Sequence, residues 1–165
     1  MRLRAWIAGF RWLHEKARRG ALASDEAQAY TEARDDLAAM LVAAQRLTLN
    51  QGQTAREALR VVRILPLELQ LSHGPARGET LDISTGGFSS VLSRALQPDE
   101  VVEFSLRVAS GLIQGRAKVA NIQQQGAAIR VSFKMEGVST ADVERMSSEV
   151  MDAALEQLAS LVETS

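Results

Sequence analysis

Residues 60–92 read RVVRILPLELQLSHGPARGETLDISTGGFSSVL, and in this stretch the apolar residues follow the spacing of β-strands. Leucines alternate with proline or polar residues along 65–71, which is the period of a strand with one buried face. Pro66 has no amide hydrogen, so it suits the start or the edge of a strand better than the centre of a sheet. Residues 72–78, with two glycines and a proline, are expected to form a loop.

Similar short apolar runs continue along the chain. We expect strands at residues 61–71, 79–83, 87–92, 101–108, 112–123 and 127–133. Turn-forming pairs such as Gly86-Gly87 and Pro98-Asp99 separate them. About six short strands at this spacing predict a small antiparallel barrel that is closed or nearly closed.

The first part of the chain has the helical period instead. Along residues 1–19, apolar side chains recur every three or four positions, the basic residues and Trp12 fall on the other side, and Gly20 is a suitable helix end. A second helix is expected from Asp25, capped by Ser24, to about Leu47 or Leu49. The residues between Tyr30 and Leu47 that repeat at helical spacing predict packing against another helix, within the chain or in a homodimer.

The last segment is predicted to be helical as well. Residues 139–142, STAD, fit a capping box, and an apolar stripe follows as far as Leu161. The predicted fold class is therefore α+β, a six-stranded antiparallel β-barrel with an N-terminal helical hairpin and a C-terminal helix. The polar residues 50–52 mark the expected boundary between a helical region, 1–50, and the barrel with its terminal helix, 53–165.

The composition excludes several functional classes. The chain has no cysteine, which rules out disulfides, thiolate catalysis and cysteine-based metal sites. His14 and His73 are too few and too far apart in sequence to suggest a metal centre. We see no nucleophile–base pair and no paired carboxylates, so we expect neither an enzyme nor a cofactor. No apolar run approaches the ~20 residues of a membrane span, and arginines interrupt the N-terminus, so we expect a cytoplasmic protein.

The charge is nearly balanced overall but is sorted along the chain. A net charge of −1 disfavours nucleic-acid binding by bulk electrostatics. Residues 1–20 are basic and the segment from Ser139 onward is acidic, so these two ends could meet, within one chain or between two. For the basic helix we favour packing of its apolar face on the second helix; contact with an anionic membrane or an acidic partner is the alternative.

Two short motifs carry the chemistry. Arg56 and Arg60 lie four residues apart at the junction between the helical region and the first strand, and DISTGG at residues 82–87 joins two predicted strands. Guanidinium groups bind phosphates in a bidentate manner and stack on purines, and a carboxylate such as that of Asp82 can accept from the N1 and N2 hydrogens of guanine. Ser84 adds a hydroxyl, and the Gly86-Gly87 pair permits close backbone approach and unusual φ and ψ angles. This chemistry alone would suit any guanine nucleotide.

Together these motifs resemble RxxxR followed by D/NxSxxG, the signature of PilZ domains, which bind the bacterial second messenger cyclic di-GMP. The resemblance covers residues 53–161. It implies that Arg56 and Arg60 hold phosphates and stack on guanine, and that Asp82, Ser84 and Gly87 contact guanine and shape the turn. Ala55 stands where many members have a basic or bulky residue, so the number of bound nucleotides stays open.

The predicted function is thus a cyclic-di-GMP receptor or adaptor that relays the second-messenger level to an unidentified protein partner through its helices. Ligand binding by the two arginines is expected to order residues 51–59. Two alternatives remain. One is a PilZ-fold interaction or oligomerisation protein that does not bind nucleotide. The other is a regulator that contacts DNA or a membrane through its basic N-terminal helix.

Overall fold

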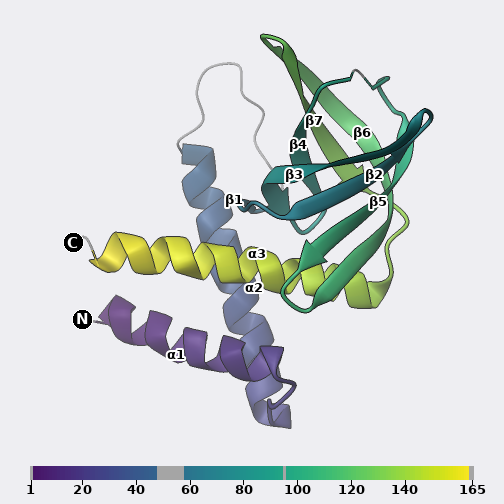
Figure 1. Ribbon diagram of the computed structural model, residues 1–165. Coiled ribbons are helices and arrows are strands. Elements are labelled where there is room, and N and C mark those ends of the chain that lie inside the picture. The colour runs from purple at the N-terminus through teal and green to yellow at the C-terminus, as the bar shows by residue number, and fades with distance from the viewer. Residues whose placement is uncertain (1, 48–57, 95, 164–165) are drawn as a thin grey trace. The chain divides into compact units, whose positions relative to one another are not determined.

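The computed structural model describes residues 2–47, 58–94 and 96–163, which form three helices and seven strands (Figure 1). The chain divides into two compact units, and each is described by itself. Met1–Leu59 and Met151–Ser165 make up a helical unit, and Arg60–Val150 makes up a β-barrel unit. The C-terminal helix α3, Thr140–Glu163, contributes its first part to the barrel unit and its second part to the helical unit.

The barrel unit is a closed six-stranded antiparallel barrel with one extra strand. Its strands are β1 (Arg60–Val62), β2 (Pro66–Leu71), β3 (Gly74–Ser84), β4 (Gly87–Leu92), β5 (Val101–Val108), β6 (Gly111–Gln125) and β7 (Ala128–Met135). The strand order is β1-β3-β2-β5-β6-β7-β4, and pairing of β3 with β4 closes the ring. The extra strand, β1, pairs with the far end of β3. The predicted fold class is confirmed.

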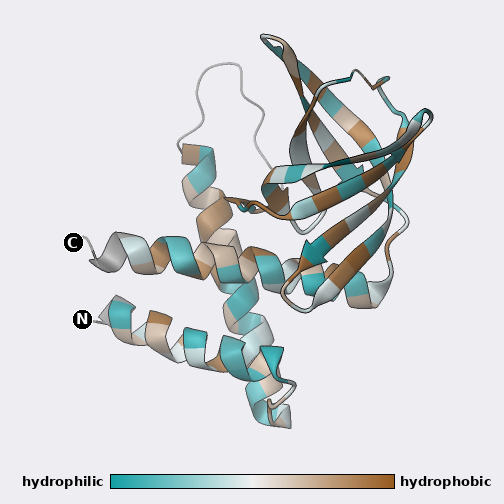
Figure 2. Cartoon of the chain, in the orientation of Figure 1, coloured by the Kyte–Doolittle hydropathy of each residue, from teal (hydrophilic) through white to brown (hydrophobic). Residues whose placement is uncertain are grey.

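The barrel interior is filled by apolar side chains from alternate strand positions. Phe88 lies at its centre, with its ring centroid 5.1 Å from those of both Phe104 and Phe133. Ile83 and Phe88 are completely buried. Figure 2 shows hydrophobic and hydrophilic residues alternating along the strands, as expected where one strand face meets the core and the other faces outward.

Two details of the strands differ from the prediction. Residues 61–71 form two strands, β1 and β2, and Pro66 begins the second one. Of residues 72–78 only 72 and 73 form a turn, because β3 starts at Gly74 and pairs with β2 from Leu71↔Gly74 onward. Five of the six β3 residues from Gly74 to Glu79 are polar, glycine or proline and most are exposed, so backbone pairing holds this part of the strand without an apolar pattern.

A buried threonine bridges the break between β1 and β2. The Thr80 hydroxyl donates to the carbonyl oxygen of Arg63 at 2.7 Å and accepts from the amide of Leu65 at 2.9 Å. Thr80 is 1% exposed and lies at a β-bulge in β3. Its side chain thus replaces the ladder hydrogen bonds that the chain loses where it leaves one strand and enters the next.

The helical unit contains α1 (Arg2–Arg18), α2 (Ser24–Leu47) and the second part of α3. Its core consists of Phe10, Tyr30, Leu37, Met151 and Leu155, with Leu13, Ala33 and Leu158 among the residues packed against it. The two predicted helices of the N-terminal region are confirmed, and Gly20 ends the first with a φ of 66°. The apolar face of α1 packs in this core, as expected.

The predicted helical seam on α2 is only partly buried. Tyr30 and Leu37 lie in the core, whereas Met40 is 60% exposed and Leu47 is 88% exposed. The first half of the seam therefore packs within the chain. The second half presents apolar side chains at the surface of the described helix.

The N-termini of α2 and α3 are capped in different ways. Ser139 caps α3 as predicted, since its hydroxyl accepts from the Asp142 amide at 3.2 Å. Ser24 does not cap α2, because the first helical hydrogen bond runs from the Ala27 amide to the Ala23 carbonyl. Ala23 is the capping residue, and the Glu26 carboxylate accepts from its amide. Lys16 and this amide lower the pKa of Glu26.

The unit also contains a buried histidine. His14 is 2% exposed, with Nδ1 2.7 Å from the Tyr30 hydroxyl and Nε2 bonded to the Asp152 carboxylate. Arg18 lies 3.3 Å from the second oxygen of Asp152. The basic first helix and the acidic last helix thus meet within one chain, which is one of the two arrangements expected from the charge pattern.

Replacing Thr80 with valine should destabilise the barrel unit by about 1–3 kcal/mol, because the variant leaves a buried amide and a buried carbonyl without their partner. Thr80→Ser keeps the hydroxyl and is the matched control. Urea denaturation followed by far-UV circular dichroism measures both. Equal midpoints for the valine variant and the unmodified chain would show that the threonine bridge does not stabilise the fold.

Candidate functional site

The turn between β3 and β4 requires glycine at position 87. Ser84 pairs with Gly87 and Gly87 with Lys134, so the turn is enclosed by the end of β7. A Cβ atom at Gly87 would lie 2.0 Å from the Phe133 carbonyl oxygen, whereas one at Gly86 would have no atom within 4 Å. Close backbone approach was expected of the Gly86-Gly87 pair; the structure shows it at Gly87, where the β7 backbone approaches, and not at Gly86.

Asp82 is the centre of the polar cluster beside this turn. The carboxylate accepts from Arg60 at 2.9 Å and from the Ser89 hydroxyl at 2.8 Å, both through Oδ1. Its other oxygen, Oδ2, accepts from Arg130 at 2.6 Å. Asp82 is 7% exposed, and Ser89 is fully buried. We call Arg60, Asp82, Ser89 and Arg130 the Asp82 cluster.

The strand register explains why these residues meet. Ile83 and Phe88 are completely buried in the barrel core, so their neighbours Asp82, Ser84 and Ser89 lie on the outer face of the strands. Asp82 pairs directly with Ser89. Arg60 lies two residues from Val62, which pairs with Asp82, and Arg130 lies two residues from Ser132, which pairs with Ser89. The long arginine side chains reach back to the carboxylate. The cluster thus spans β1, β3, β4 and β7.

The structure brings together most of the residues that the sequence singled out. Arg60, Asp82, Ser84 and Gly87 lie at one corner of the barrel, where β1 and β4 flank the end of β3. Ser84 is 6% exposed, and its hydroxyl is 3.4 Å from the Gly87 carbonyl oxygen. Arg56 lies outside the described residues.

Sequence reasoning missed Arg130 and Ser89. The alternation of Ile129, Val131 and Phe133 as inward residues could have placed Arg130 on the outer face of its strand. It could not show which strand lies next to β7, because β4 and β7 are far apart in sequence. That pairing follows from the closed ring.

The cluster suits a polar anionic ligand. Two guanidinium groups and one carboxylate leave a formal charge of +1, and the side chains of Arg60 and Arg130 are 21% and 30% exposed. Each guanidinium has five N–H donors, so both arginines can donate to a ligand while they remain bonded to Asp82. Elsewhere, the residues that the structure describes contain no group of three His, Asp or Glu side chains able to hold a metal ion.

Comparison with known proteins gives one family. The family model of the PilZ domain matches residues 54–151. No curated protein sequence matches the chain.

Solved structures show the same fold at low identity. Escherichia coli YcgR in complex with c-di-GMP is 17% identical with a TM-score of 0.58, over 67% of this chain and 50% of YcgR. The K. pneumonia MrkH–c-di-GMP complex is 18% identical with a TM-score of 0.59, over 66% and 56%. The Bacillus subtilis inhibitor of motility MotI/DgrA is 18% identical with a TM-score of 0.57, over 63% and 53%. This chain therefore spans about half the length of these proteins.

Gly87→Ala should destabilise the barrel unit by about 1–3 kcal/mol, since the added methyl group overlaps the β7 backbone, which must shift. Gly86→Ala places the same methyl group in open space one residue earlier and should change stability by less than about 0.5 kcal/mol. Thermal unfolding measured by circular dichroism compares the two. A Gly86 variant as unstable as the Gly87 variant would contradict the steric explanation.

Proposed function

We propose, since this chain belongs to the PilZ domain family, that it is a receptor for cyclic di-GMP and binds it at the Asp82 cluster. The observation that carries the proposal is the Asp82 carboxylate holding Arg60 and Arg130 together beside the turn between Ser84 and Gly87. YcgR and MrkH, which share this fold, form complexes with c-di-GMP, which supports this choice of ligand.

Each residue of the cluster has a role that its chemistry suits. Arg60 and Arg130 would bind the phosphates and stack on guanine. Asp82 accepts three hydrogen bonds from described residues, and a carboxylate has about four acceptor sites. Its remaining site could accept from the N1 or N2 hydrogen of guanine. Ser84 and the Gly87 backbone would border the base, and Arg56 would hold a phosphate.

We further propose that the protein is a non-catalytic adaptor. Binding at the Asp82 cluster would be relayed through the helical region, 1–50, or α3 to a protein partner or a second copy of the chain. The exposed apolar side chains of Met40 and Leu47 on α2 support such a contact. No helix in the described part of the chain is both long and apolar enough to cross a membrane. We place the protein in the cytoplasm, where the second messenger is found.

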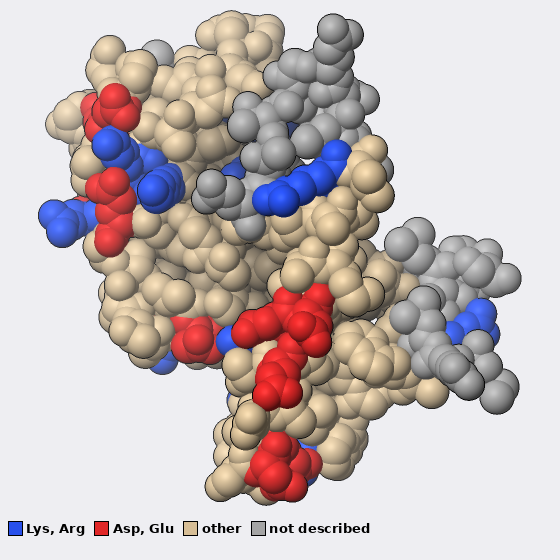
Figure 3. All heavy atoms as spheres, turned by 180° about the vertical axis from the view of Figure 1, so that it is seen from behind, with Lys and Arg blue, Asp and Glu red and all other residues tan. Residues whose placement is uncertain are grey.

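The basic first helix supports DNA or membrane binding less well. Lys16 pairs with Glu26, Arg18 with Asp152 and Arg19 with Glu15, so much of its charge is engaged within the chain. On the face in Figure 3, acidic side chains form one patch, basic and acidic side chains lie next to each other at one edge, and no basic surface extends across the described residues drawn there; the outer face of α1 is turned away in this view. A regulator driven by electrostatics needs a continuous basic surface.

One observation favours a second candidate, a PilZ-fold interaction protein that binds no nucleotide. The charged side chains of the Asp82 cluster already pair with one another, since both carboxylate oxygens are bonded to arginines of the chain. Such a network could serve only to fix β1 and β7 against β3. Isothermal titration calorimetry with cyclic di-GMP separates the candidates: saturable heat supports the receptor, and its absence up to millimolar ligand supports the interaction protein.

Arg60→Ala should weaken cyclic-di-GMP binding by at least about tenfold, because a hydrogen bond to a charged group contributes about 1.5–3 kcal/mol. Arg107, exposed on β5 and outside the Asp82 cluster, gives the matched control Arg107→Ala. Calorimetric titration of both variants reports affinity and stoichiometry. Equal affinities would remove Arg60 from the binding site.

Arg130→Ala tests the residue that the sequence did not reveal. Its guanidinium is bonded to Asp82 and partly exposed, so its loss should also weaken binding by about tenfold or more. Arg130→Lys retains the charge but not the planar fork and should recover only part of the affinity. If Arg130→Ala binds cyclic di-GMP as tightly as the unmodified chain does, then Arg130 has a structural role and does not contribute to binding.

A further inference from the structure

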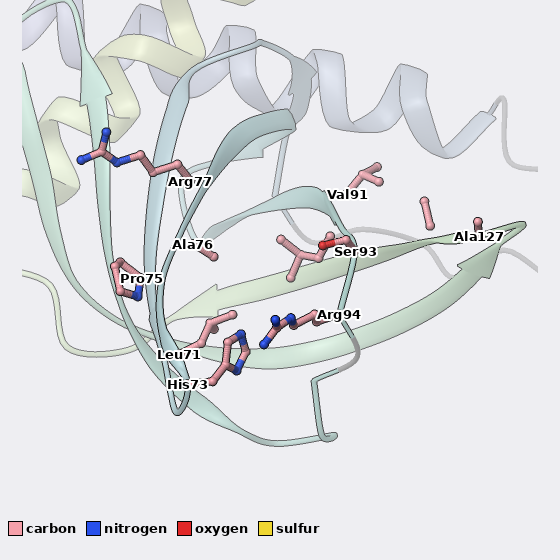
Figure 4. A pocket seen from close by; sticks show the side chains of 11 residues that line it. Leu71, His73, Pro75, Ala76, Arg77, Val91, Ser93, Arg94 and Ala127 are labelled. Atoms are coloured by element: carbon pink, nitrogen blue, oxygen red, sulfur yellow. The ribbon is translucent and has the colours of Figure 1, made fainter.

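The barrel has a pocket at the end that lies away from the turn between Ser84 and Gly87. Its volume is about 700 Å³, and the β2–β3 hairpin, the end of β4 and the start of β7 line it (Figure 4). Along β4, the step from Gly87 to Leu92 is five residues, or about 17 Å. None of the pocket residues belongs to the Asp82 cluster.

The strand register accounts for this pocket. Pairing of β3 with β4 extends only as far as Thr80↔Ser90. Beyond it, residues 74–79 of β3 pair with β2 alone, and Val91 and Leu92 pair with β7 alone. The wall of the barrel therefore opens between two strand edges, and the backbone groups on these edges have no strand beside them among the described residues.

Basic side chains dominate the polar lining of the pocket. His73, Arg77 and Arg94 line it, and no aspartate or glutamate does. Arg77 is paired with Glu68 at 3.3 Å and is highly exposed. Arg94 and His73 form no hydrogen bond or ion pair with any residue in the part of the chain that the structure describes. Figure 4 shows these two side chains near Leu71, and Arg77 apart from them.

Apart from Ser93, the remaining lining is apolar. Leu71, Pro75, Val91 and Ala127 contribute hydrocarbon surface, and Val91 is 40% exposed. Pockets of about 300–1,000 Å³ with apolar walls and a few convergent polar groups are typical of small-molecule sites. Unneutralised basic groups beside an apolar wall favour a molecule that has a negative charge at one end and a hydrocarbon or aromatic body at the other.

We propose that this pocket is a second ligand site, separate from the Asp82 cluster, that takes a small organic anion with an apolar body. The anionic group, a carboxylate, sulfonate or phosphate monoester, binds Arg94 and His73. The body lies against Leu71, Val91 and Ala127. Both sites are built on β3 and β4, one at each end of their paired region.

The fluorescent sulfonate 8-anilinonaphthalene-1-sulfonate has this chemistry and is the probe for the test. It should bind the full chain saturably with one molecule per chain at the pocket.

Arg94→Glu, which reverses the charge of an exposed residue, should weaken binding by about tenfold or more. Arg107→Glu makes the same charge change on β5, outside the pocket, and should leave the affinity unchanged. N-phenyl-1-naphthylamine, which lacks the sulfonate, should bind at least about tenfold more weakly than the probe.

Amide chemical shifts in two-dimensional NMR locate the bound probe. The proposal expects the largest changes at residues 71–77, 91–94 and 127–128, with an unchanged thermal midpoint for Arg94→Glu. Largest changes in the helical unit, or equal affinity of the Arg94 and Arg107 variants, would overturn it. If Arg94→Glu is unstable, Arg94→Gln replaces it with the same expected loss.

A cyclic-di-GMP titration of the Arg94 variant completes the test. Its affinity should match that of the unmodified chain, because the two sites share no residue. A loss of cyclic-di-GMP affinity would show that the pocket and the cluster are one site and would refute a separate second site.

Discussion

Pairing between β3 and β4 joins the last strand of the order to β3, which is next to the first, and without it the same strands would form an open sheet with two unpaired edges. At the same corner Gly87 has no side chain where the β7 backbone passes, so β4 can pair with β7 there. Together these pairings bring β7 within reach of β3 across β4, although the two strands lie far apart in sequence. The Asp82 cluster depends on this closure, since Arg130 belongs to β7. The pocket at the other end exists because the pairing stops at Thr80↔Ser90.

Asp82 lies on the outer face of the barrel strands, yet its carboxylate is almost inaccessible to solvent. A carboxylate that is 7% exposed loses most of its hydration, which is unfavourable unless charged or polar donors replace the water. Two guanidinium groups and a serine hydroxyl do so here. The arginines themselves remain partly exposed. An anion can therefore reach them without first breaking their bonds to Asp82, and the same geometry stabilises the unliganded chain and suits a phosphate ligand.

The sequence predicted the parts of the fold in which local pattern and tertiary burial agree. Short apolar runs between turn-forming pairs predicted β4 and β5 with their observed bounds. In β5 every second residue is buried, so its apolar pattern follows the core. Residues 74–78 were wrongly predicted to be a loop, since their pairing with β2 relies on backbone hydrogen bonds, which leave no trace in residue type. Similarly, Ser24 has the preferred capping side chain, but Ala23 caps α2 because Glu26 satisfies its amide from within the helix.

Residue chemistry predicted less of the candidate site than of the fold. The two motifs drew attention to Arg56, Arg60, Asp82, Ser84 and Gly87 because together they match the order and spacing of the PilZ signature. Arg130 sits in the middle of a regular strand, and Ser89 is a common strand residue, so neither has a local signal. Their role comes only from the register that sets them beside Asp82, and register between distant strands is a property of the closed barrel rather than of any short segment.

The helical unit contains a buried polar network of its own, which constrains how its helices pack. His14 is bonded on one side to Tyr30 of α2 and on the other to Asp152 of α3, so a single side chain of α1 fixes its position against two helices at once. Shifting α3 by one residue would rotate Asp152 by about 100° around its helix axis and leave a buried ring nitrogen without its partner, which is costly. Apolar packing of Phe10, Leu37 and Leu155 alone tolerates such a shift more easily, because hydrophobic contacts have no direction. The histidine thus selects one arrangement of the three helices from the several that their apolar faces would allow.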